Sequence, residues 1–331
     1  MLSLTKQPRA GFGVSLLLGL LLASVAQAQQ LKIIDAALIP SPEEICQLHT
    51  EAYKGNHYFR VQEFEAAGKT AAVTFDVTYN GFTPEAEAAF QAAVDIWASL
   101  LSSSETIHVN ASWVGMAPTI LGSAGPNGAL ALSGFPDGIN RVVGRPLAEA
   151  LLGSNTNGTS ADINANFNSN FADWYFGTGA PPPGEVDFTS VVLHELGHGL
   201  NFIRFADVSA GQGSMDLDAG PDVLYGVNDV EYIDGSAVYL RDTGTYPDPG
   251  TDLGTALTGG FGGVFFNGSV ATATHGTAPR RWNRAATASA SNRSTSTARS
   301  STARRSRWPW ICRATLCSLR PIPTRSIPKR N

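Results

Sequence analysis

The feature that most constrains this chain is a short apolar segment that carries three ionisable side chains, two histidines and a glutamate, at fixed spacing. Residues 188–200 read FTSVVLHELGHGL and directly follow Asp187, a favoured helix N-cap residue. The apolar residues around the polar ones predict a buried helix. Two histidines and a glutamate on a buried helix need partners, because polar groups buried without partners cost free energy. The segment therefore predicts a chemical site inside the fold.

The spacing of these three polar residues suits a metal ion. His194 and His198 are four residues apart and so lie on the same face of a helix, where both imidazoles can bind one Zn²⁺ ion at about 2.0–2.1 Å. Glu195 is one step round the helix, where it can act as general base toward water. The alternative is that these are ordinary helix residues, since H-E-x-x-H also arises by chance. We predict His194 and His198 as metal ligands and Glu195 as the catalytic residue.

The rest of the chain predicts an α+β fold. Residues 69–79 alternate β-branched and aromatic side chains before a turn at Asn80-Gly81, which predicts a strand. Thr83 and Pro84 then begin a predicted helix. Further strands are expected at residues 106–113 and 162–170, whereas residues 120–160 are rich in Gly, Asn and Ser and are expected to form loops.

The stretch VVLHELGHGLNF resembles the active-site helix of the metzincin-like zinc proteases, which include the leishmanolysin-like enzymes. The stretches LGSAGPN and DINANFNSNFADWYFGT are similar to secreted bacterial peptidases that often carry a protease-associated domain, although no such second domain is apparent. The resemblance implies a mixed twisted sheet with a backing helix and an active-site HExxH helix. It also implies an extracellular zinc-dependent endopeptidase that hydrolyses peptide bonds.

The chain departs from the family pattern after the second histidine. The family's glycine and third histidine are replaced by Asn201 and Arg204; asparagine tolerates the left-handed turn that ends a helix, but arginine cannot ligate zinc. His275 is one candidate for a third ligand. Otherwise we expect the missing ligand in the C-terminal part of the domain that a frameshift near residue 280 would have replaced. An acidic segment offers a further third ligand or a Ca²⁺ site, formed by Asp216, Asp218, Asp222 and Glu231. Without a third ligand, the alternative is a catalytically inactive secreted relic or binding module.

The two ends of the chain differ from its body. Residues 1–28 combine Lys6 and Arg9, an apolar run of about ten residues and Ala26-Gln27-Ala28, which predicts a signal peptide and a secreted protein, extracellular or periplasmic. That run is shorter than the roughly 20 residues of a membrane span. Residues 29–68 form an N-terminal segment and residues 69–278 the expected catalytic domain.

Residues 279–331 have a different composition from everything before them. They carry 13 of the 23 Lys+Arg and none of the 28 Asp+Glu, and they lack any hydrophobic period, so a disordered basic tail is expected. Two explanations fit: a frameshift near residue 280 or a genuine tail. Read one base earlier, the codons for residues 308–312 spell an ordinary amphipathic segment, which favours the frameshift.

Charge and cysteine content exclude some classes of protein. The acidic body argues against nucleic acid as a partner and for solubility. Protein or peptide substrates are what the resemblance to zinc proteases implies. Three cysteines, two of them in the basic tail, exclude a disulfide-stapled scaffold. We expect a monomer.

Overall fold

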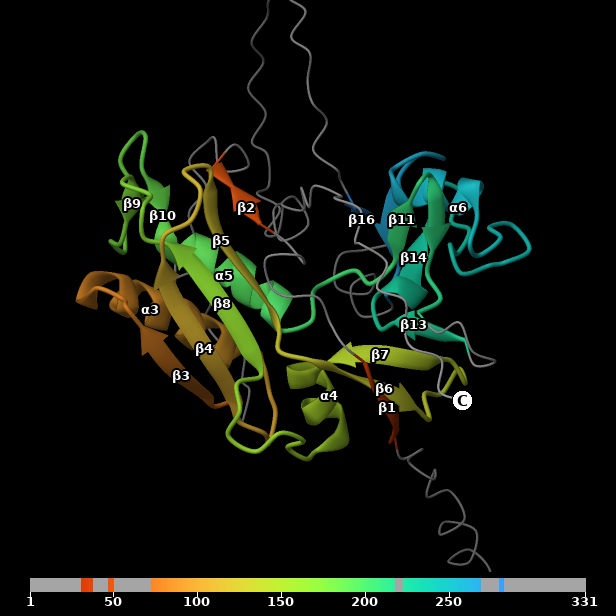
Figure 1. Ribbon diagram of the computed structural model, residues 1–331, viewed down its shortest axis with the longest axis horizontal. Helices are drawn as coiled ribbons and strands as arrows, with labels where there is room; N and C mark the ends of the chain where they lie inside the picture. Colours follow the sequence, from red (N-terminus) through yellow and green to blue (C-terminus); the bar gives the residue numbers. More distant parts are fainter. Residues whose placement is uncertain (1–30, 38–46, 51–72, 218–222, 269–279, 283–331) are drawn as a thin grey trace, which may run out of the picture.

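The computed structural model describes residues 31–37, 47–50, 73–217, 223–268 and 280–282. It is a mixed α+β fold in which strands outnumber helices, which confirms the predicted class (Figure 1). None of the helices in these ranges combines the length and the apolar character that a membrane span requires. The predicted signal peptide, residues 1–28, lies outside the described residues.

A five-stranded mixed sheet holds the largest hydrophobic core. Its strands, in spatial order, are β2 (Leu48–His49), β5 (Ile120–Pro126), β8 (Ile163–Asn168), β4 (Ile107–Val114) and β3 (Phe75–Asn80). β3, β4 and β8 are parallel, whereas β5 runs antiparallel to β8 and β2 antiparallel to β5. The strands predicted near residues 69–79, 106–113 and 162–170 are confirmed as β3, β4 and β8.

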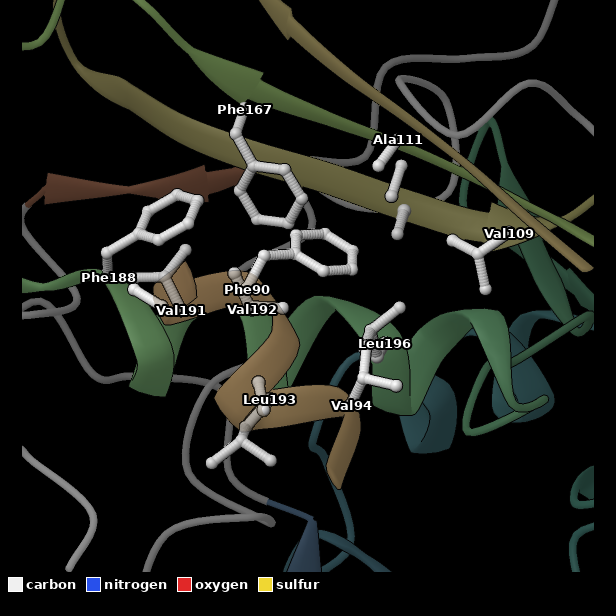
Figure 2. Close-up of a cluster of buried hydrophobic side chains, with 14 of the residues drawn as sticks. Phe90, Val94, Val109, Ala111, Phe167, Phe188, Val191, Val192, Leu193 and Leu196 are labelled. Atoms are coloured by element: carbon white, nitrogen blue, oxygen red, sulfur yellow. The ribbon is translucent and has the colours of Figure 1, made fainter. Parts of the chain in front are cut away.

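Two helices cover one face of this sheet. α3 (Pro84–Leu100) begins at its predicted N-cap, where the Thr83 hydroxyl accepts the Ala86 N–H at 3.3 Å. α5 (Phe188–Gly199) contains the three polar residues of the predicted site. Between the helices and the strands lie side chains of both layers, among them Phe90, Ala111 and Phe167 (Figure 2). Burial of this apolar surface is what holds α5 against the sheet.

The expectation of loops at residues 120–160 is wrong. This stretch forms β5, β6 (Ala129–Ser133), β7 (Asn140–Gly144) and α4 (Arg145–Leu152). β5 is rich in small residues and packs closely on β8: a Cβ on Gly122 would lie 2.9 Å from Phe167 Cδ1 and 3.0 Å from the Asn166 carbonyl oxygen. Small residues carry little hydrophobic periodicity, so the pattern that predicts strands is absent from the sequence.

The next two strands after β5, β6 and β7, belong to a second sheet that has its own small hydrophobic core. Its order is β1 (Lys32–Ala37), β6, β7 and β13 (Leu224–Gly226), with β7 and β13 parallel and the other pairs antiparallel. α4 packs on β6 and β7, where Leu132 and Val143 are buried. The chain enters α4 directly from Gly144 at the end of β7.

The remaining elements are short. They comprise β9 (Trp174–Tyr175), β10 (Val186–Asp187), β11 (Asp207–Ser209), β12 (Gln212–Ser214), the 3₁₀ helix η3 (Asp229–Glu231), β14 (Tyr232–Ile233), α6 (Thr251–Leu257), β15 (Val264–Phe266) and β16 (Arg280–Trp282). Those after α5 enclose a further hydrophobic cluster that includes Met215, Tyr232 and Leu253.

β16 lies at the start of the segment expected to be disordered, residues 279–331, and corrects that expectation for residues 280–282 alone. Arg280–Trp282 pairs antiparallel with β15. Such pairing uses backbone N–H and C=O groups, so it can form in a segment whose side chains show no period. Residues 283–331 lie outside the described residues, and the two explanations of the tail stay predictions.

Candidate metal centre

The N-terminal end of α5 forms as its sequence predicts. The Asp187 carboxylate accepts the Ser190 N–H at 2.9 Å and thereby satisfies one of the helix's first free donors. Val191, Val192 and Leu196 are fully buried, so the helix is anchored on its apolar side. The next turns of the same helix carry the two histidines and the glutamate.

His194 and His198 direct their Nε2 atoms at the same point. The two Nε2 atoms are 3.1 Å apart, and the ring centroids are 4.7 Å apart with the planes nearly perpendicular at 86°. Two nitrogens bound to one tetrahedral Zn²⁺ ion at about 2.0–2.1 Å would lie about 3.3 Å apart. The pair therefore has the separation that two ligands of one zinc ion require.

The other ring nitrogen of His198 is held by the backbone. His198 Nδ1 lies 2.8 Å from the Phe202 carbonyl oxygen, which can only accept, so Nδ1 carries the proton and donates. His198 Nε2 then presents a lone pair, the arrangement that a metal-binding histidine needs. In the metal-free chain, the same lone pair can accept a hydrogen bond from His194 Nε2–H.

Burial keeps both imidazoles neutral. It lowers the pKa of His194 well below the ordinary value of 6.5, and the neighbouring His198 lowers it further. Burial also lowers the pKa of His198, against the opposing effect of its hydrogen bond to Phe202. Because metals bind the neutral ring, these shifts favour ligation at neutral and mildly acidic pH.

The free energy of unfolding of the metal-free chain is expected to fall as the pH is lowered below about 6.5. Unfolded histidines take up protons near that pH, whereas the buried pair in the folded chain does not, so acid favours the unfolded state. The pair's contribution is complete above the unfolded pKa and is lost once the pH has fallen past the folded pKa. Each unit between the two pKa values is worth about 1.4 kcal/mol per histidine.

This dependence is measured by urea unfolding between about pH 5 and pH 8, with His194→Gln as the comparison. The wild-type chain is expected to lose more stability than the variant over this range. Asp229 has the opposite effect on the pH dependence of stability, because burial raises its pKa to about 6. It is present in both proteins, so its effect cancels when their stabilities are compared. Equal slopes for the two proteins would contradict the prediction.

Glu195 follows His194 on α5, is fully buried and hydrogen-bonds to the sheet. Its Oε2 accepts the backbone N–H of Ala124 in β5 at 2.9 Å. A backbone N–H that donates to one carboxylate oxygen restrains the position of that oxygen without transferring a proton to it. The predicted base is thus oriented by a strand 71 positions away in the sequence.

The positions that follow α5 take other roles than in the family pattern. Asn201 adopts the predicted left-handed conformation, with φ of 83°. Arg204 donates through Nη1 to the Leu257 carbonyl at the end of α6, at 3.2 Å. Its positive charge also acts on buried Asp229. Arg204 therefore interacts with the elements that follow α5 and does not take the place of a zinc ligand.

The third ligand stays a prediction. His275, Asp218 and Asp222 lie outside the described residues. Asp216 Oδ1 accepts the Leu224 N–H at 3.0 Å, and Glu231 ends η3. Within the described part of the chain, no three His, Cys, Asp or Glu side chains gather in a way that could hold a metal ion. The predicted Ca²⁺ site likewise stays a prediction.

Sequence reasoning missed three backbone groups that shape this site. They are the N–H of Ala124, the carbonyl of Phe202 and the N–H of Gly144, which donates to the Asn201 side chain. Backbone groups occur at nearly every position, so no residue type marks them. Only a correct assignment of β5 and β7 as strands would have placed two of them near the helix.

Comparison with known proteins adds one finding. Residues 44–207 match a family model described as SPBPB7E8-like, a range that includes the five-stranded sheet, α5 and the turn after it. No curated protein and no solved structure matches the chain.

Proposed function

We propose that this chain is a zinc-dependent peptidase whose metal site is built on α5. The observation that carries the proposal is the convergence of His194 Nε2 and His198 Nε2 to 3.1 Å, with Glu195 buried on the same helix. We also propose that the three parallel strands, antiparallel β5 and the covering helices correspond to the metzincin-like arrangement that the sequence resembles.

Each residue has one role in this proposal. His194 and His198 would hold the ion, with His198 fixed in the Nδ1–H tautomer by the Phe202 carbonyl. A Zn²⁺ ion at such a site supplies Lewis acidity toward a peptide carbonyl and toward water. Glu195 takes a proton from the attacking water and passes it to the leaving amine, while the Ala124 N–H keeps its carboxylate in place.

The setting of the enzyme is part of the same proposal. The signal peptide expected at residues 1–28 would export the chain, so its substrates would be extracellular or periplasmic proteins and peptides. The acidic composition of the body supports solubility and not nucleic-acid binding.

A second candidate is a catalytically inactive secreted relic or binding module that keeps the fold. The observation that favours it is that the described residues bring together no set of three metal ligands. A two-histidine site binds more weakly and lacks the closed geometry that poises a water for attack. The two candidates share the histidine pair and differ in whether peptide bonds are cleaved.

Zinc titration of the full-length, metal-free chain, followed by casein hydrolysis with the loaded protein, tests both candidates. We expect about one Zn²⁺ per chain and hydrolysis, and neither in a His194→Ala/His198→Ala variant. His49→Ala, outside the pair, serves as the control and should behave as wild type. Zinc binding without hydrolysis would favour the inactive relic or binding module, and absence of zinc binding would remove the peptidase.

A further inference from the structure

The chain reverses direction immediately after α5 through a defined turn. The Phe202 N–H donates to the Gly197 carbonyl at 2.9 Å, and the Asn201 N–H donates to the His198 carbonyl at 2.9 Å. Together with the left-handed conformation of Asn201, these bonds form a Schellman motif. The motif brings the Phe202 carbonyl back over the helix, where it accepts the proton of His198 Nδ1.

Asn201 does more in this turn than supply a positive φ. Its side chain is buried, with 2% of its surface exposed, and Oδ1 accepts the backbone N–H of Gly144. Its carbonyl accepts from Asn228 Nδ2 at 2.6 Å, and the same amide donates to the Ile203 carbonyl at 3.0 Å. The turn is therefore tied to the second sheet and to the segment after β13.

The contact with Gly144 leaves no room for a larger residue there. A Cβ on Gly144 would collide with Asn201 Oδ1 and would lie 2.8 Å from Pro126 Cγ. Gly144 joins β7 to α4, so the Asn201 side chain links the end of α5 to a rigid strand–helix junction. Glycine at position 201 would make the same turn but could not make this link.

We propose that Asn201 is a positioning residue for His198: its side chain, bound to the Gly144 N–H, holds the Phe202 carbonyl where it fixes the Nδ1–H tautomer of His198. The effect on the His198 tautomer does not depend on the proposed function. The expected consequence, tighter metal binding, does rest on it. Outer contacts that orient a histidine ligand typically change metal affinity by about 10–100-fold when removed.

Asn201→Gly is the test variant, because glycine keeps the left-handed turn and removes only the link. Two properties of full-length wild type and variant are compared at about pH 8: the tautomer of His198, from ¹⁵N NMR of the metal-free chain, and the Zn²⁺ dissociation constant. We expect the variant to populate both tautomers of His198 and to bind zinc about 10-fold or more weakly.

Two further variants separate positioning from general stability. Asn201→Asp keeps an acceptor oxygen for the Gly144 N–H and should retain the wild-type tautomer. Gly153→Ala strains another left-handed helix end, that of α4, where nothing lies within 4 Å, and should leave both readouts unchanged.

The outcomes are distinct. A folded Asn201→Gly chain with wild-type tautomer and affinity would overturn the inference, as would Asn201→Asp behaving like Asn201→Gly. If the wild-type chain binds no zinc but Asn201→Gly still releases the tautomer, the positioning role stands and the proposed function fails.

Discussion

Replacement of Glu195 by glutamine is expected to lower peptide hydrolysis by about 10²–10⁴-fold while zinc binding stays intact. Glutamine has nearly the same shape, and its amide oxygen can still accept the Ala124 N–H that Glu195 Oε2 accepts at 2.9 Å. It cannot take a proton from water at neutral pH. The loss should therefore appear in kcat, with the Zn²⁺ dissociation constant and the melting temperature close to wild type.

The matched control is Glu185→Gln, which removes an exposed carboxylate just before β10. This variant should cleave casein at the wild-type rate. Hydrolysis by Glu195→Gln at a rate near wild type would show that another group acts as the base. If the wild-type chain itself binds zinc and does not cleave, the binding module is the better account.

Truncation of Phe188 to alanine is expected to cost about 3–5 kcal/mol of unfolding free energy. Phe188 is fully buried at the start of α5, near Phe167 (Figure 2). Its ring centroid lies 5.0 Å from that of Trp174 and 5.2 Å from that of Phe167. Edge-to-face pairs of this kind add about 0.5–1.5 kcal/mol each beyond the area they bury. A domain has only about 5–15 kcal/mol in total, so the variant should unfold at much lower urea concentration.

Urea unfolding followed by tryptophan fluorescence measures this cost, because Trp113 and Trp174 both contact the Phe188 ring. Leu151→Ala is the control: this α4 side chain is 44% exposed, and its removal should change the unfolding free energy by about 0.5 kcal/mol or less. A loss below about 1 kcal/mol for Phe188→Ala would show that the aromatic cluster is not closely packed.

The elements that sequence reasoning located share strong local signals. α3 and α5 begin at capping residues, Thr83 and Asp187, whose side chains accept an N–H within their own first turn. β4 and β8 alternate buried and partly exposed side chains, which is the pattern that predicts a strand. β5, β6 and β7 lack that alternation because nearly all of their residues are buried and many are small. Their strand conformation comes from pairing with β8 and with one another, which no local pattern reports.

In the candidate site, too, some features follow from the local sequence and others from tertiary contacts. The sequence by itself determined that His194 and His198 share one helix face, that Glu195 lies beside them and that Asn201 can take a left-handed turn, because these follow from helix geometry and residue type. Tertiary structure alone decided that the Ala124 N–H orients Glu195 and that the Gly144 N–H binds Asn201. It also brought the Phe202 carbonyl to His198 Nδ1. These contacts join backbone groups to side chains, and since every residue carries the same backbone, only the folded path of the chain selects which of them meet the helix.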